Sequence, residues 1–171
     1  ALEGSETEQF QLQWDDEKAN EQKDAEKYLY SAPLTTEHMS RGARILLVED
    51  NAVNQLVAQS LLESEGYVVS VENNGREALE LLKKCGSRTV YSLVIMDCQM
   101  PEMDGFEATR RIREGDGGNQ YKAIPIVAMT ANAMQRDREM CLQSGMDDFL
   151  TKPVDQEKVI STLHKWLGKT P

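Results

Sequence analysis

The chain has 171 residues, of which 40% are hydrophobic and 28% charged, a composition typical of a globular protein. No apolar run is long enough to cross a bilayer, and the acidic N-terminus lacks the apolar stretch of a secretory signal, so no membrane contact is expected. The formal net charge is −10, which disfavours direct binding to a nucleic-acid backbone.

Charge and composition divide the chain near residue 40. Residues 1–40 hold ten acids and three lysines, a net charge of −7, and are poor in aliphatic side chains. Such a segment cannot bury much core, so we expect an acidic linker or tail, or the end of a preceding domain. Residues 41–171 carry the apolar patterns of a folded domain.

Short apolar runs alternate with segments of helical period in residues 41–171. The expected strands are residues 45–48, 67–71, 92–96, 124–129 and 149–150. The expected helices run from residue 53 to a glycine stop at residue 66, and over residues 75–84, 106–113, 131–144 and 155–167. This alternation predicts an α/β fold, a doubly wound five-stranded parallel sheet with helices on both faces.

Local patterns add detail to three of these segments. Asp155 is the expected N-cap of the last helix, and the glycine-rich residues 115–120 predict a loop. The first helix carries an apolar stripe on one face, formed by Val53, Leu56, Val57, Leu61 and Leu62.

Polar side chains follow four of the expected strands: Glu49 and Asp50, then Asp97, Thr130 and Lys152. The carboxyl ends of the strands form the reactive edge of a doubly wound sheet, so we expect these side chains to converge. Three adjacent carboxylates repel one another, and a bound cation relieves that repulsion. Oxygen ligands in a small open site favour Mg²⁺.

Asp97 is the expected nucleophile of this group. A carboxylate can attack a phosphoryl group and form an acyl phosphate. The negative charge of the transferred group must be neutralised, and Lys152 would supply positive charge beside that of Mg²⁺. The hydroxyl of Thr130 would donate a hydrogen bond to a phosphoryl oxygen.

Four motifs then carry a resemblance to a known family. They are VEDN at residues 48–51, MDCQMPEMDGFEATRRIR at 96–113, MTAN at 129–132 and DDFLTKP at 147–153. Together they resemble the receiver domains of response regulators and hybrid histidine kinases over about residues 41–168, which implies a flavodoxin-like fold. The departures are mild: the acidic pair is Glu-Asp where Asp-Asp is also common, and the loop at residues 115–120 is somewhat long.

The resemblance also implies a role for each residue of the site. Asp97 becomes the phospho-acceptor, and its catalytic partners are Thr130 and Lys152. Asp50 is favoured over Glu49 as the direct metal ligand of the acidic pair. The implied magnesium ligands are Glu49, Asp50, Asp97 and the backbone carbonyl of Gln99. The implied switch residues are Thr130 and Phe149, and the peptide bond before Pro153 is expected to be cis.

The VEDN opening with Asn54-Gln55, and the MDCQMP motif, are most similar to those of the C-terminal receiver of a hybrid sensor histidine kinase. The resemblance implies that a histidine kinase domain, in the same chain or a separate one, donates the phosphoryl group. A histidine phosphotransfer protein would then receive it, and phosphorylation would shift the surface formed by the last strand and last two helices. The implied location is the cytoplasm, including the cytoplasmic part of a membrane-bound kinase, and residues 4–14 would in that case be the last strand of a kinase domain.

Two other functions remain open. An aspartyl-phosphate phosphatase would use related chemistry, but it needs a second acid near the nucleophile, where this chain has Gln99, and a cap insertion. A phosphate-independent scaffold usually lacks the acidic pair, the acceptor or the lysine, and all of them are present. We expect a phosphoryl acceptor with at most slow self-dephosphorylation, which leaves its classification as an enzyme open.

The three cysteines, Cys85, Cys98 and Cys141, do not have the number or spacing of a disulfide framework or a zinc site. They favour a reducing, cytoplasmic setting. Cys98 adjoins Asp97, and we expect it to be a small buried apolar side chain.

Overall fold

The computed structural model describes residues 42–132 and 134–168, and the predictions for residues 1–40 lie outside these ranges. The strands are β1 (Arg44–Val48), β2 (Val68–Glu72), β3 (Leu93–Asp97), β4 (Ile126–Thr130) and β5 (Asp148–Thr151). The helices are α3 (Ala52–Ser64), α4 (Gly75–Lys84), α5 (Gly105–Glu114), α6 (Gln135–Ser144) and α7 (Gln156–Leu167), with a short 3-10 helix, η1 (Asn119–Tyr121).

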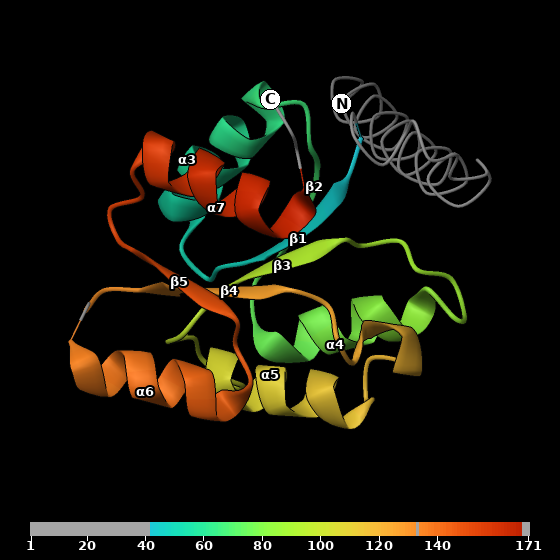
Figure 1. The fold of residues 1–171 in the computed structure, drawn as a ribbon. Coiled ribbons are helices and arrows are strands. Elements are labelled where there is room, and N and C mark those ends of the chain that lie inside the picture. Colours follow the sequence, from blue (N-terminus) through green and yellow to red (C-terminus); the bar gives the residue numbers. More distant parts are fainter. Residues whose placement is uncertain (1–41, 133, 169–171) are drawn as a thin grey trace, which may run out of the picture. The chain divides into compact units, whose positions relative to one another are not determined.

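The five strands form one parallel sheet in the order β2-β1-β3-β4-β5 (Figure 1). All four neighbouring pairs run parallel. The first three strands place β1 between β2 and β3, and the chain then winds in the other direction through β4 to β5. The predicted doubly wound, five-stranded fold is therefore confirmed.

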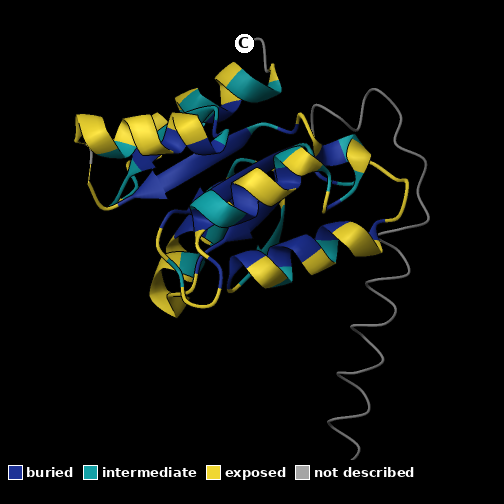
Figure 2. Ribbon diagram, turned by 90° about the horizontal axis from the view of Figure 1, so that it is seen from below, coloured by how far each residue is buried: buried dark blue, intermediate teal, exposed yellow. Residues whose placement is uncertain are grey.

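Helices cover both faces of the sheet, with α3 and α7 on one side and α4, α5 and α6 on the other (Figure 1). The alternation along β1 explains the two layers. Leu46 and Val48 belong to the apolar cluster on the side of α4 and α5, whereas Ile45 and Leu47 belong to the cluster that includes α3 and α7. All four side chains are fully buried, as expected for a central parallel strand, and Figure 2 shows the buried sheet beneath helices with exposed outer faces.

The boundaries differ from the predicted ones where local chemistry intervenes. Strand β4 begins after Pro125, because proline lacks the N–H that a central strand must donate. Helix α6 begins at Gln135 rather than at residue 131. A tight turn takes up the difference: the hydroxyl of Thr130 accepts from the Asn132 N–H and donates to the Asn132 carbonyl.

Helix α3 turns part of its apolar stripe outward. Ala58 and Leu62 are buried against the sheet, but Val53, Leu56 and Val57 are 68%, 66% and 51% exposed. The predicted stripe is thus split, and only its C-terminal end reaches the core. Three neighbouring apolar side chains remain on the surface at the N-terminal end of α3.

Candidate functional site

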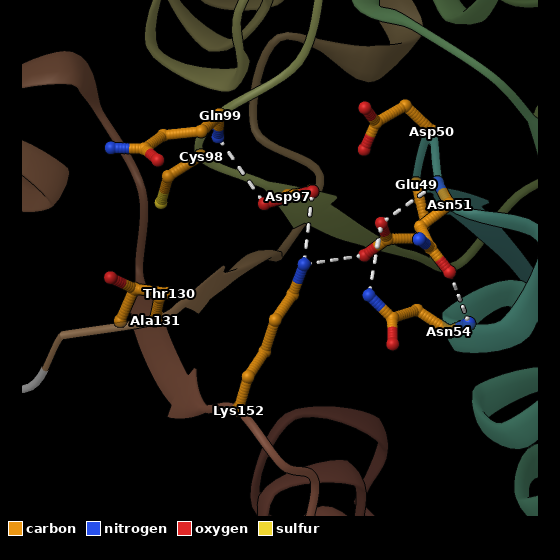
Figure 3. Close-up of a pocket in the computed structure, with 10 residues that line it drawn as sticks. All are labelled: Glu49, Asp50, Asn51, Asn54, Asp97, Cys98, Gln99, Thr130, Ala131 and Lys152. Atoms are coloured by element: carbon orange, nitrogen blue, oxygen red, sulfur yellow. Dashed lines mark hydrogen bonds and ion pairs between the residues drawn. The ribbon is translucent and has the colours of Figure 1, made fainter.

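The carboxyl ends of β1, β3, β4 and β5 surround an open pocket of about 200 Å³ (Figure 3). The pocket contains all five of the polar side chains that the sequence places after strands, together with Gln99. Its lining residues are Glu49, Asp50, Asn51, Asn54, Asp97, Cys98, Gln99, Thr130, Ala131 and Lys152. The convergence expected from a parallel sheet is therefore present.

Lys152 lies between two buried carboxylates, as Figure 3 shows. Its Nζ atom is 3.0 Å from Oδ2 of Asp97 and 2.8 Å from Oε2 of Glu49. Glu49 is fully buried and Asp97 is 4% exposed, whereas the lysine side chain is 24% exposed. The ammonium group therefore bridges two buried carboxylates, while part of the lysine side chain stays exposed.

Burial and charge act in opposite directions on these three groups. Burial raises the pKa of Asp97 to about 6; Lys152 opposes the rise and the charge of Glu49 adds to it. Burial also disfavours ionised Glu49, but hydrogen bonds from Lys152 and Asn51 outweigh it and lower the pKa of Glu49. Burial disfavours charged Lys152, yet its two carboxylate partners outweigh that effect and raise its pKa. Lys152 and Glu49 are thus held in their charged forms, and of the two carboxylates Asp97 is the more easily protonated.

Glu49 is positioned by Asn51, Asn54 and Gln55, residues to which the sequence motifs assigned no role in the site. The Glu49 Oε1 atom accepts from the Asn51 backbone N–H at 3.1 Å and from the Asn54 side chain at 3.5 Å. Gln55 donates to the Glu49 carbonyl at 2.6 Å and to Asn73 at 2.9 Å, which ties the end of β1 to the loop after β2. The sequence signal for Asn54 and Gln55 is their place in the opening motif that follows the acidic pair.

The three acids form a compact group of oxygen donors. One carboxylate oxygen each from Glu49, Asp50 and Asp97 lies within 4.8 Å of the other two, and Asp50 is the exposed member. Three carboxylate oxygens this close together suit a hard divalent cation, and the exposed side of the group leaves room for waters that the ion would retain. The donor set therefore fits the expected Mg²⁺.

The remaining predicted residues surround Asp97 at different distances. The Gln99 backbone N–H donates to the Asp97 Oδ1 atom at 3.2 Å. Thr130 lines the pocket, but its hydroxyl is bonded to Asn132 rather than directed at Asp97. Phe149 is half-buried outside the pocket lining, where the Arg138 guanidinium lies 4.6 Å from its ring centroid.

Two backbone features shape the same edge. The bond between Lys152 and Pro153 is cis, as predicted. Gly105 opens α5 directly against β3, and a Cβ atom there would overlap the Asp97 backbone oxygen. A glycine is needed for this close approach, which holds the N-terminus of α5 next to Asp97.

Similarity to known proteins identifies the family of this chain. The sequence model of the response regulator receiver domain matches residues 45–164. The chain belongs to the response regulator receiver domain family. Hybrid signal transduction histidine kinase B of Dictyostelium discoideum is 45% identical over 130 residues, and the sensor protein GacS of Pseudomonas syringae pv. syringae is 41% identical over 129. These matches cover 71% and 75% of this chain but only 6% and 14% of the two relatives.

Solved receiver domains share the fold. The receiver domain of sensor histidine kinase PA1611 from Pseudomonas aeruginosa PAO1, which has a magnesium ion coordinated in its active site cleft, is 43% identical, with a TM-score of 0.66 over 75% of this chain and 99% of that one. The receiver domain of Ssk1 from Saccharomyces cerevisiae, crystallised with the histidine phosphotransfer protein Ypd1, is 32% identical, with a TM-score of 0.65 over 74% and 89%. The chain is therefore a receiver domain of two-component signalling, and hybrid histidine kinases are among its relatives. Among the helices that the structure describes, none is both long and apolar enough to span a membrane.

Proposed function

We propose that Asp97 accepts a phosphoryl group from a phosphohistidine and that the domain works in a phosphorelay. One observation carries the proposal: a buried carboxylate with an ammonium group 3.0 Å away lies at the bottom of an open pocket beside two further acids. This arrangement offers a nucleophile, a fixed positive charge and a set of metal ligands within one small space.

The chain's own groups have separate roles in the transfer. An Asp97 oxygen forms the bond to phosphorus as the phosphorus–nitrogen bond of the donor breaks, and the electron pair stays on the imidazole. Lys152 keeps its proton and pairs with a phosphoryl oxygen as negative charge gathers there. The Gln99 N–H holds the second Asp97 oxygen, which orients the carboxylate for attack.

The proposed ligands of Mg²⁺ are Asp50, Asp97 and the Gln99 carbonyl, with Glu49 at the buried side of the group. When bound, the ion would neutralise part of the phosphoryl charge. Glu49 is fully buried and held by Lys152, Asn51 and Asn54, so it is better placed to support the site than to contact an entering ion. The exposed Asp50 is the better placed direct ligand of the pair.

Phosphorylation would be read out through Thr130. Its hydroxyl is held by Asn132 in the described state, in the turn that leads to α6. A phosphoryl oxygen on Asp97 would compete for that hydroxyl and would shift the population of this turn. Phe149 on β5 packs beside Arg138 of α6, so it is the proposed second member of the switch.

The partner surface that we propose lies beside the pocket. The exposed Val53, Leu56 and Val57 of α3 adjoin an apolar groove of about 140 Å³. Val57, Met129 and Val154 help to line the groove, which shares Glu49, Asn54 and Lys152 with the phosphoryl pocket. Exposed apolar patches of this kind mark interaction sites. A helical histidine phosphotransfer protein could cover the patch while its histidine reaches Asp97.

Intact-mass spectrometry after incubation with acetyl phosphate tests the acceptor. We expect one phosphoryl adduct that requires Mg²⁺ and that Asp97→Asn abolishes. Asp116→Asn, a change of the same kind at an exposed loop position, is the matched control and should be phosphorylated like the wild type. An adduct that survives in Asp97→Asn would place the chemistry on another residue, and no adduct in any folded variant would favour the scaffold function.

A further inference from the structure

Two cysteines that are 43 residues apart in sequence meet beside the phosphoryl pocket. The Sγ atoms of Cys98 and Cys141 are 3.8 Å apart, which is contact distance for sulfur, and both thiols are free. Cys98 directly follows Asp97 in the chain, and Cys141 lies in the middle of α6. The residues are 4% and 2% exposed. The contact therefore joins the loop after β3 to the helix that follows the Thr130 turn.

Cys98 is also reached from the pocket. It is one of the lining residues of the open 200 Å³ cavity, as Figure 3 shows, although little of its surface faces bulk solvent. The pocket proposed to admit the phosphoryl donor would thus bring a small hydroperoxide to Cys98, whose sulfur lies in the buried contact with Cys141. Cys85, the third cysteine, is buried elsewhere, and its thiol donates a hydrogen bond to the Leu81 carbonyl.

We propose that Cys98 and Cys141 form a redox modification site that takes a hydroperoxide as its substrate, and that its disulfide suppresses phosphorylation of Asp97. Hydrogen peroxide would oxidise the Cys98 thiol to a sulfenic acid and leave as water. The Cys141 sulfur would then attack the sulfenic sulfur, a second water would leave, and the S–S bond would form. In total the two thiols lose two electrons and two protons, and the peroxide is reduced to two waters.

Contact between the thiols favours the second step. A sulfenic acid on Cys98 would meet Cys141 at once, because two groups held in contact react as if at very high concentration. Both thiols are almost completely buried, so the first step is slow and the oxidant must act for a long time.

The effect on Asp97 follows from geometry and rests on the proposed function. A disulfide has a sulfur–sulfur distance of about 2.05 Å, so the two sulfurs must approach by about 1.8 Å. Cys98, which is the residue next to Asp97, and helix α6 would have to make this movement. A displacement of about 1 Å in a reacting group can cost about 100-fold in rate, so we expect phosphorylation of the oxidised domain to slow by at least about tenfold.

The test oxidises the full chain with hydrogen peroxide, alkylates it under denaturing conditions and maps the tryptic peptides. We expect one intramolecular, reducible link between the peptides of Cys98 and Cys141, which leaves only Cys85 of the three cysteines open to alkylation. Cys85→Ser, the matched control, should form the same link, whereas Cys141→Ser should form none. Peptides without that link, or an equal loss of free thiols in Cys141→Ser, would overturn the proposal.

The functional arm measures the initial rate of adduct formation with acetyl phosphate and Mg²⁺ before oxidation, after oxidation and after reduction. The rate should fall at least about tenfold on oxidation and recover with a thiol reductant, while oxidised Cys141→Ser should keep its reduced rate. A mapped disulfide with an unchanged rate would overturn the suppression. If the reduced protein gains no adduct at all, the proposed function fails, and peptide mapping still decides the redox site.

Discussion

Lys152 is the residue on which the charge balance of the site depends. It is the ion-pair partner of both Glu49 and Asp97, and Glu49 is completely buried. Removing one partner of a buried pair costs much more than removing a surface charge, because the remaining carboxylates lose their compensation. Any loss of the ammonium should therefore affect stability as well as phosphorylation.

Lys152→Ala is expected to lower the free energy of unfolding by about 2–3 kcal/mol without Mg²⁺. Millimolar Mg²⁺ should restore part of the loss, because a bound cation would also neutralise the acids. Urea unfolding followed by circular dichroism measures both effects. Lys165→Ala is the control: its side chain is 64% exposed, and its ion pair with Asp148 should be worth about 0.5 kcal/mol or less. Equal losses in the two variants would contradict this account of the site.

Glu72, at the end of β2, gives the domain a pH-dependent stability. Burial raises its pKa to about 7, and the charge of Glu77 adds to the rise. The folded state therefore binds this proton more tightly than the unfolded state, whose pKa is about 4.5. Stability from this group is complete below pH 4.5 and is lost as the pH rises to about 7.

Glu72→Gln cannot ionise and should escape that loss. We expect the free energy of unfolding of the variant to exceed that of the wild type by about 1–2 kcal/mol at pH 8. This difference should shrink toward zero near pH 5. Urea titrations at the two pH values provide the measurement. Glu114→Gln, at an exposed site, should show no such pH-dependent gain. A Glu72→Gln gain that is the same at both pH values would mean that ionisation of Glu72 is not the cause.

Among the elements, α3 combines a structural role with the proposed role in partner recognition. Its buried side holds Ala58 and Leu62 against the sheet, while Asn51 caps its first turn by accepting from the Val53 and Asn54 N–H groups. The exposed apolar residues contribute little to the core, so their proposed value lies in partner binding. Helix α6 also exposes an apolar side chain, Leu142, at 64%. The two helices therefore allow a matched comparison.

Leu56→Glu should slow phosphotransfer between the domain and a histidine phosphotransfer protein by at least about tenfold, since it puts a charge into an apolar contact. Its phosphorylation by acetyl phosphate should stay close to that of the wild type, because the small donor needs no docking surface. Leu142→Glu makes the same change at a similarly exposed site on α6 and should leave both reactions unaffected. Radiolabel transfer assays compare them. A larger defect in Leu142→Glu would move the docking surface to α6.

For the molecule as a whole, the apolar periodicity of the sequence was enough to predict the parallel sheet and the edge where the site forms. The joint position of Asp97, Lys152 and the acidic pair followed from their place at the carboxyl ends of parallel strands. Side-chain orientation could not be predicted in that way. The outward turn of Leu56 depends on the packing of α3 on the sheet.

Two side-chain contacts at the pocket could not be predicted from the sequence. The hydrogen bond from Thr130 to Asn132 depends on a local turn, and the contact between Cys98 and Cys141 depends on how α6 packs. Neither leaves a periodic pattern, because each involves single side chains brought together by the tertiary structure.

Arg113 connects three parts of the fold that are separate in sequence. From the end of α5, its guanidinium donates to the carbonyls of Gly145, Lys122 and Ile124 at 2.7–2.9 Å, and its Nη2 atom lies 2.8 Å from Asp147. Such a fork of donors is specific to arginine. It links the approach to β4 with the turn between α6 and β5.

Arg113→Lys keeps the charge opposite Asp147 but cannot reach the three carbonyls. We expect it to lower the free energy of unfolding by about 2–3 kcal/mol, since partly buried carbonyls would lose their donors. The urea midpoint should fall with an unchanged slope, because the domain would still unfold as one unit. Arg111→Lys, at a surface ion pair with both side chains more than 40% exposed, should change stability by less than about 0.5 kcal/mol. If the slope also fell in Arg113→Lys, the fold would have separated into parts, and the network would govern cooperativity rather than stability alone.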